Sequence, residues 1–332
     1  MIWLEFFGST VLIVIAARFL ARYGDVISVR TGLGGVFIGT LLMAGATSLP
    51  ELLTAVNAIN QDAPSLTVGN IFGSSMFNMF LLAVVDLLFY RVHILRRVTI
   101  NHAVSASLAV LIHAAAVFFI LAEVDLSLGW VGIDSLVLIG VYIVGTRILV
   151  GNGDDSDAEE AEEIPEETPS LRHALIGFAA AALALLLLTP ILVSSSIAIA
   201  EETGLGTGFV GVALVGIVTS LPEVMTTISA ARIGAYDLAI GNLFGSNLFN
   251  VFALGLVDFF FTDGRFLAEV SPAMTIAGML ALVMTTLALL GNLARHLTRG
   301  GTRRLLTEID ALLIAILYVL GMLLLYDRNL IG

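Results

Sequence analysis

Residues 45–55, GATSLPELLTA, place a proline beside a glutamate within an apolar run long enough to cross a membrane. Pro50 has no backbone N–H to donate to the carbonyl of Ala46, and its ring displaces that carbonyl. Within a bilayer, a freed carbonyl has to be satisfied by water, a neighbouring group or an ion. The stretch therefore predicts a helix break that exposes backbone oxygens beside the carboxylate of Glu51.

The composition indicates a membrane protein. Of the 332 residues, 58% are hydrophobic and only 13% are charged, whereas about a quarter are charged in soluble domains. A membrane-spanning helix needs about 20 apolar residues. Apolar windows of about this length lie at 2–21, 33–58, 65–89, 98–121, 128–149, 173–199, 206–230, 237–261, 271–292 and 309–326. We therefore expect an all-α polytopic membrane protein with ten transmembrane helices and no separate soluble domain.

Charge predicts how the chain lies in the membrane. All 15 basic residues are arginines, and with ten spans thirteen of them fall on one side and two, Arg265 and Arg328, on the other. Since cytoplasmic loops are rich in arginine and lysine, both termini are expected outside. The acidic run 153–168 would then be a cytoplasmic loop, read as a solvated connector rather than a calcium site because it lacks EF-hand spacing. Cysteine is absent, which excludes disulfides and thiolate metal sites.

The chain contains an internal duplication. Residues 33–86 align without a gap with residues 205–258, and 25 of the 54 positions are identical. We expect residues 1–150 and 171–332 to form two five-helix repeats separated by an acidic loop at 151–170. Because five is odd, the second repeat would enter the membrane inverted, an arrangement common in secondary transporters that bind substrate near the bilayer midplane.

The duplicated motifs carry oxygen ligands at matching positions. Thr47, Ser48 and Glu51 share a helix face, since residues three and four apart are neighbours on a helix. The following span repeats polar residues every four positions. The pooled set of side chains near the midplane is Thr47, Ser48, Glu51, Asn70, Ser74 and Asn78, with Thr219, Ser220, Glu223, Asn242, Ser246 and Asn250 in the second repeat. Oxygen-only ligation suits calcium and sodium and argues against zinc or copper.

Several residues have competing interpretations. Asn70 and Asn242 fit either ion ligation or hydrogen bonding between helices. Asp86 and Asp258 lie near helix ends, which favours snorkelling or loop capping. A structural role is favoured over a proton relay for His102 and His113. Small residues at four-residue spacing, Gly69, Gly73, Gly241 and Gly245, predict close helix approach.

At these residues the sequence resembles the cation/calcium exchanger superfamily, which includes the sodium/calcium exchangers. The resemblance lies in "GATSLPE…GNIFGSSMFN" and "VTSLPEV…GNLFGSNLFN", and the expected inverted layout extends it to the whole chain. It implies that Glu51 and Glu223 are the principal calcium ligands and that Thr47 and Thr219 offer backbone carbonyls. It further implies oxygens for sodium from the threonines and from Ser48, Ser220, Ser74 and Ser246, a ring completed by Asn78 and Asn250, and sliding of the first and sixth helices to alternate access. Many relatives carry Asp at the position of Asn78 or Asn250, so this chain departs from them in having two central carboxylates.

The function expected is an antiporter in the plasma membrane that exchanges Ca²⁺ for Na⁺, with exchange of a divalent cation for H⁺ as the alternative. A passive channel and an intramembrane enzyme are disfavoured, the latter because the spans lack a nucleophile and base motif. The transported Ca²⁺ and Na⁺ would bind as substrates, with no cofactor. The expected partners are these ions and the lipid bilayer, with no nucleic acid and no obligate protein partner.

Overall fold

The computed structural model describes residues 1–31, 43–89, 101–151, 169–297 and 309–328. The acidic run 153–168 and the start of the second predicted span therefore lie outside the described residues, as do the arginines of two predicted cytoplasmic loops, at 91–97 and 299–304.

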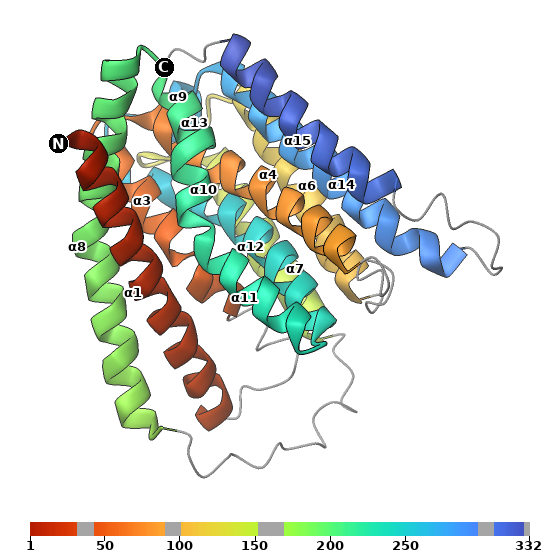
Figure 1. The fold of residues 1–332 in the computed structure, drawn as a ribbon. Coiled ribbons are helices and arrows are strands. Elements are labelled where there is room, and N and C mark those ends of the chain that lie inside the picture. Colours follow the sequence, from red (N-terminus) through yellow and green to blue (C-terminus); the bar gives the residue numbers. More distant parts are fainter. Residues whose placement is uncertain (32–42, 90–100, 152–168, 298–308, 329–332) are drawn as a thin grey trace.

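The described chain is almost entirely helical (Figure 1). The first half contains α1 (Ile2–Thr31), a short helix over 43–47, α3 (Leu49–Ile59), α4 (Pro64–Leu88), α6 (Asn101–Ala122) and α7 (Ile133–Gly151). The second half contains α8 (Leu171–Thr203), α9 (Thr207–Val210), η2 (Gly211–Val215), α10 (Gly216–Thr219), α11 (Leu221–Arg232), α12 (Tyr236–Val257), η3 (Asp258–Phe260), α13 (Phe266–Glu269), η4 (Pro272–Met274), α14 (Thr275–Leu297) and α15 (Ile309–Asp327).

Within the described residues, seven helices are long and apolar enough to cross a membrane, and a bent pair raises the number to eight. The bent pair joins Thr207–Thr219 to Leu221–Arg232 at an angle of 43°. The sequence predicted one span over 206–230, and the structure divides it because Pro222 cannot continue the preceding hydrogen-bond ladder. The two other predicted windows hold α3, with 11 residues, and α7, with 19 residues.

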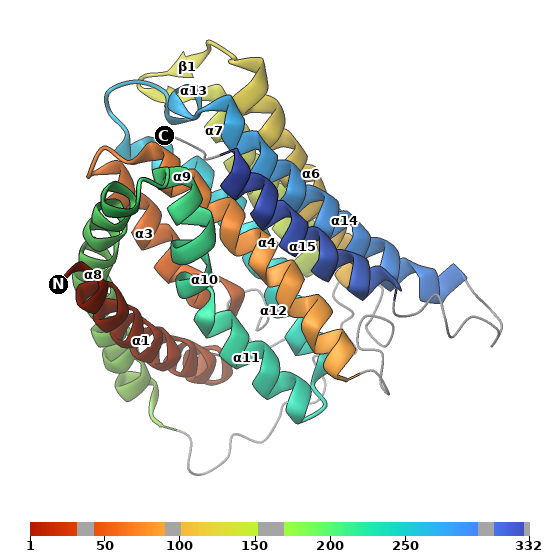
Figure 2. The ribbon, with the colours of Figure 1, turned by 45° about the horizontal axis from the view of Figure 1, so that its top comes forward.

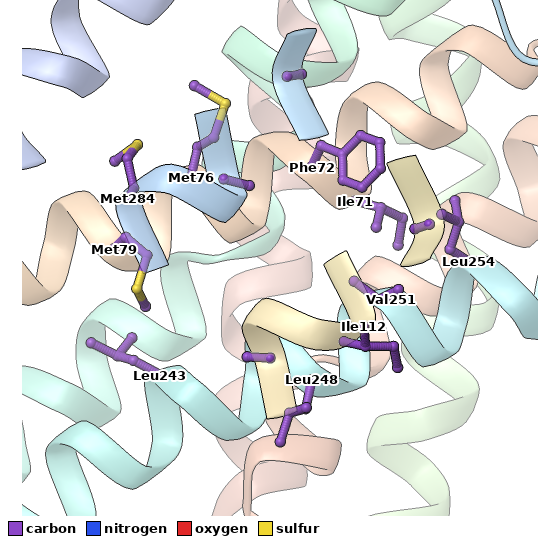
Figure 3. Packing of buried hydrophobic residues seen from close by; sticks show 14 of the residues in the cluster. Ile71, Phe72, Met76, Met79, Ile112, Leu243, Leu248, Val251, Leu254 and Met284 are labelled. Atoms are coloured by element: carbon purple, nitrogen blue, oxygen red, sulfur yellow. The ribbon is translucent and has the colours of Figure 1, made fainter. Parts of the chain in front are cut away.

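Two central helices, α4 and α12, form the middle of the fold. They are 72% buried over their most apolar stretches, whereas α8 and α15 are only 28% buried and leave most of their side chains facing outward. Figure 3 shows their packing, with side chains of α4 and α12 meeting those of α6 and α14. The labelled residues are Ile71, Phe72, Met76, Met79, Ile112, Leu243, Leu248, Val251, Leu254 and Met284.

The two longest described helices, α1 and α8, lie side by side. Both α1 and α8 run along one flank of the molecule in Figures 1 and 2, where α8 also packs against α3. The helices α6, α14 and α15 lie on the opposite flank, beyond α4. The motif-bearing segments are therefore enclosed between two groups of apolar helices.

Close helix approach, predicted from the spaced glycines, is confirmed for α4. A Cβ atom on Gly69 would meet the carbonyl oxygen of Gly208, and one on Gly73 would lie 2.6 Å from the Cα of Val212. In the second repeat, a Cβ on Gly245 would lie 2.7 Å from the Cβ of Ala44. The small residues therefore let α4 lie almost backbone to backbone against the segment Gly208–Val212, and they let α12 approach Ala44 closely.

A small hairpin interrupts the otherwise helical fold, which the sequence did not predict. Strands β1 (Ser127–Leu128) and β2 (Val131–Gly132) pair antiparallel within the predicted window 128–149, so α7 begins only at Ile133. The first loop residue, Gly129, has φ of 70°, which glycine adopts without strain and which tight hairpin loops require.

Candidate functional site

The two Ser-Leu-Pro-Glu segments break their helices at the same point. Ser48, with φ −90° and ψ 6°, precedes α3, and Ser220, with φ −84° and ψ 3°, precedes α11. In each case the proline occupies the first turn of the new helix, where its missing N–H is not needed. The break predicted from the sequence is therefore present in both repeats, with nearly identical backbone conformation.

The break places each glutamate in the first turn of a helix. Glu51 is 1% exposed and Glu223 is fully buried. The positive end of a helix macrodipole lies at its N-terminus and stabilises negative charge there. The fold thus supports two carboxylates in a buried position, where isolated charges are costly.

Each glutamate is held by the serine of the other repeat. Ser48 Oγ donates to Glu223 Oε1 at 2.9 Å, and Ser220 Oγ donates to Glu51 Oε1 at 3.1 Å. The motif matches the Ser-x-x-Glu pattern of a capping box, in which the serine would accept from its own helix. Neither serine makes such a cap here. The hydroxyls instead join the two repeats.

A second reciprocal pair connects the threonines with Asn70 and Asn242. Thr219 Oγ1 donates to Asn70 Oδ1 at 3.0 Å, and Thr47 Oγ1 lies 3.3 Å from Asn242 Oδ1. Asn70 Nδ2 also donates to the carbonyl of Glu51 at 3.1 Å. Both ends of the Asn70 amide are therefore engaged in bonds between helices, and the structure favours this interpretation over ion ligation.

Four buried oxygen atoms at the centre have no hydrogen-bond partner. They are Oε2 of Glu51, Oε2 of Glu223, Oδ1 of Asn78 and Oδ1 of Asn250. All four residues are at most 1% exposed. Buried polar atoms almost always have a partner, and leaving one without costs about 1–3 kcal/mol. Four such atoms at symmetry-related positions of the two repeats are what a cation-binding site requires of its ligands.

The remaining two predicted ligands differ between the repeats. Ser246 Oγ donates to Glu223 Oε1 at 3.2 Å, whereas its counterpart Ser74 donates to the carbonyl of Gly216 at 3.1 Å and lies 3.3 Å from Thr219 Oγ1. Glu223 thus accepts from two hydroxyls where Glu51 accepts from one. The structure brings all ten predicted site residues into buried positions on the facing elements, with this one asymmetry.

The donor set is that of a hard cation. Two carboxylates, six hydroxyl-bearing residues and two amide oxygens provide oxygen alone, which suits Ca²⁺ or Na⁺. Among the described residues, no group of three or more His, Cys, Asp or Glu side chains lies close enough together to hold a metal ion. The site therefore carries two negative charges when both glutamates are ionised, enough to balance one divalent ion or two monovalent ions.

Polar residues outside the ring of Glu51, Glu223, Asn78 and Asn250 have structural partners. Asp258 caps a loop, because Oδ2 accepts from the Gly132 N–H at 2.7 Å and Oδ1 from the Phe266 N–H at 2.6 Å. His113 Nδ1 lies 2.8 Å from the carbonyl of Ala109. His102 Nε2 lies 3.2 Å from Asp237 Oδ1. These contacts agree with the structural roles expected for Asp258 and the histidines.

Sequence reasoning missed two residues that contact the ring. Ser75 and Asn247 are fully buried and bond to Asn250 and Asn78. The signal available was a mismatch in the duplication, since "GSS" at 73–75 corresponds to "GSN" at 245–247.

Several long apolar helices around a buried ring of oxygen ligands define a multi-pass membrane protein that handles cations. The sequence model of the family described as "Sodium/calcium exchanger protein" matches residues 1–151 and 173–326. The chain therefore belongs to the sodium/calcium exchanger family, a family of transporters, and it is a cation exchanger.

The chain is also similar to individual proteins and to solved structures. An uncharacterized membrane protein of Methanocaldococcus jannaschii is 29% identical over 214 residues, covering 64% of this chain and 67% of that protein. The sodium/calcium exchanger MaX1 of Methanosarcina acetivorans is 27% identical over 313 residues, covering 83% and 87%. A structure of the sodium-calcium exchanger NCX_Mj, soaked with Na⁺ and Sr²⁺, matches with a TM-score of 0.61 and 25% identity, covering 97% of this chain and 99% of the other.

Proposed function

We propose that this protein exchanges Ca²⁺ for Na⁺ across the membrane and that both ions bind in the ring formed by Glu51, Glu223, Asn78 and Asn250. The observation that carries the proposal is the set of four buried oxygens without a hydrogen-bond partner, one from each of these residues. Two carboxylate and two amide oxygens provide four of the six to eight ligands that Ca²⁺ takes. Backbone carbonyls of Thr47 and Thr219 would supply further oxygens at the helix breaks.

Charge makes the two ions competitors. One Ca²⁺ or two Na⁺ ions neutralise the two glutamates, and an unneutralised buried charge is costly. The hydroxyls of Ser48, Ser74, Ser220 and Ser246 offer neutral oxygens for the monovalent ion. Ions that compete for one set of ligands are sufficient for antiport, since release of one permits binding of the other.

The architecture we propose is ten spans in two inverted five-helix repeats, with the acidic loop between them. Every one of the ten predicted windows contains helix in the described residues. The duplication aligns in register, and the bonds between Ser48 and Glu223 and between Ser220 and Glu51 relate the halves reciprocally. Inverted repeats with a shared midplane site are typical of alternating access.

The arginine distribution supports a plasma-membrane orientation with both termini outside and the loop in the cytoplasm. In this orientation an inward sodium gradient would drive calcium out of the cell.

Exchange of Ca²⁺ for H⁺ is the second candidate. It is favoured by one observation, that the ring's charge rests entirely on two glutamates, which can each take up a proton. The serine hydroxyls donate hydrogen bonds to these carboxylates and so stabilise the ionised form of the glutamates. An ionised glutamate needs a cation rather than a proton, and this favours sodium as the coupling ion.

The test is uptake of radioactive calcium into proteoliposomes loaded with sodium and diluted into sodium-free buffer, compared with a pH gradient alone. We expect uptake driven by the sodium gradient and abolished in Glu51→Gln and in Glu223→Gln. The matched control is Glu269→Gln, because Glu269 is exposed and distant in sequence from both motifs. Uptake driven only by protons would favour the second candidate. If neither gradient drives uptake, the ion assignment is wrong.

A further inference from the structure

The two ends of an asparagine amide are not equivalent toward a cation. The oxygen Oδ1 is a ligand, whereas the Nδ2 group carries two donor hydrogens and repels positive charge. An aspartate at either position would avoid this problem, since both of its carboxylate oxygens are acceptors. With asparagine at both positions, this chain needs a device that turns Oδ1 of Asn78 and Asn250 toward the ring.

Asn247 provides such a device for Asn78. Asn247 Nδ2 donates to the backbone carbonyl of Ser75 at 3.2 Å, and Asn247 Oδ1 accepts from Asn78 Nδ2 at 3.0 Å. A carbonyl can only accept, so it fixes which end of the Asn247 amide faces it. Asn247 Oδ1 must then receive the Nδ2 of Asn78. The carbonyl oxygen of Ser75 therefore fixes the donor and acceptor of both hydrogen bonds. Asn78 Oδ1 is left facing the ring without a partner.

Ser75 provides the equivalent device for Asn250 by a different route. Ser75 Oγ donates to the carbonyl of Ile71 at 3.1 Å, which uses its only hydrogen. The same oxygen can then only accept, and it receives Asn250 Nδ2 at 3.3 Å. Asn250 Oδ1 is consequently left in the ring without a partner.

The two devices occupy equivalent positions of the duplication, since residue 75 plus the repeat offset of 172 is 247. Both are anchored on backbone carbonyls of one turn of α4, those of Ile71 and Ser75. Ser75 of "GSS" and Asn247 of "GSN" thus orient the facing asparagine amide in two different ways. Both residues are fully buried, so solvent does not compete for these bonds.

We propose that Ser75 and Asn247 are positioning residues that set the amide orientation of Asn250 and Asn78, and thereby the cation affinity of the ring, without touching the ion. This inference rests on the proposed function, because it assumes that the ring binds the transported cation.

The experiment is a double-mutant cycle read as the KM for calcium in sodium-driven uptake, with maximal rate and protein melting temperature measured alongside. Asn247→Ala should raise the KM by about tenfold, since it removes the partner of a buried amide. In an Asn78→Asp background the same change should not raise the KM, because Asn247 Oδ1 has no hydrogen to donate to a carboxylate and its removal costs the aspartate at position 78 no hydrogen bond. A residue that only supports the fold would have the same effect in both backgrounds.

Two further variants test the inference if Asn247→Ala folds poorly. Asn247→Ser should retain a KM close to that of the unmodified protein, since the serine can donate to the carbonyl of Leu243 as Ser75 does to that of Ile71. Ser75→Ala should raise the KM, and Asn250→Asp should remove that effect. Ser107→Ala is the matched control. Ser107 Oγ donates to the carbonyl oxygen of Ala103, four residues earlier, at 2.7 Å, and neither residue belongs to the ring.

Equal effects of Asn247→Ala with Asn78 or Asp at position 78 would overturn the inference, as would an unchanged KM in both Asn247→Ala and Ser75→Ala. Failure of the proposed function has a different signature. In that case the unmodified protein would show no sodium-driven calcium uptake, or Glu51→Gln and Glu223→Gln would leave that uptake intact.

Discussion

Ser48 of the first repeat donates a hydrogen bond to the Glu223 carboxylate of the second across 2.9 Å, although the two residues are 175 positions apart in the chain. The reciprocal bond from Ser220 to Glu51 completes the relationship. Each repeat therefore donates a serine hydrogen bond to the carboxylate of the other, and Ser246 adds a bond to Glu223 within the second repeat. Any movement that separates the two breaks would remove a donor from both glutamates at once, so the ring acts as one unit.

This relationship predicts matched effects of the two serines. We expect Ser48→Ala and Ser220→Ala each to raise the KM for calcium by about tenfold, because hydrogen bonds to charged groups contribute about 1.5–3 kcal/mol. The measurement is the concentration dependence of sodium-driven calcium uptake. Ser107→Ala serves again as the control. A large effect of one serine with none of the other would show that the carboxylates are held independently.

The close approach of α4 to the broken span predicts that Gly69 tolerates no side chain. Gly69→Ala would push a methyl group into the carbonyl of Gly208, and overpacking of this kind costs about 1–3 kcal/mol. We expect a lower melting temperature of the purified protein. Gly140→Ala is the matched control, because no atom lies within 4 Å of a Cβ placed there. An equal change in melting temperature for the two variants would contradict the packing described here.

The loop cap at Asp258 predicts a loss of stability that is separable from transport. Asp258→Ala leaves the N–H groups of Gly132 and Phe266 without their acceptor, and an unsatisfied buried donor costs about 1–3 kcal/mol. The melting temperature should fall, while the KM for calcium of the remaining folded protein stays unchanged. Asp263→Asn, on the exposed part of the same loop, should change neither. A raised KM in Asp258→Ala would instead place this carboxylate in the ion pathway.

Much of this arrangement was predictable because its determinants are local. Pro50 and Pro222 break their helices through a missing N–H, an effect that needs no tertiary context. The four-residue spacing of Asn70, Ser74 and Asn78 places them on one face of α4 in any helix. The duplication could be read directly from identical residues.

Other features depend on contacts that a sequence does not display. The bond from Ser48 to Glu223 joins segments that are distant in the chain, and no local pattern indicates it. The π-helical turn at Gly211–Val215 lies where α4 presses its glycines against the second repeat. Asn70 could be assigned only once Thr219 and the Glu51 carbonyl were found at its two ends. Ser75 and Asn247 looked like a small imperfection of the repeat until their partners were known.

The measurement that tests the central claim most directly is calcium binding to the purified protein by titration calorimetry, with and without sodium. One ring shared by both repeats predicts one calcium ion per chain, competition by sodium, and loss of binding in Glu51→Gln and equally in Glu223→Gln. Two independent calcium ions per chain, or full binding retained in either variant, would contradict a single site held between the repeats.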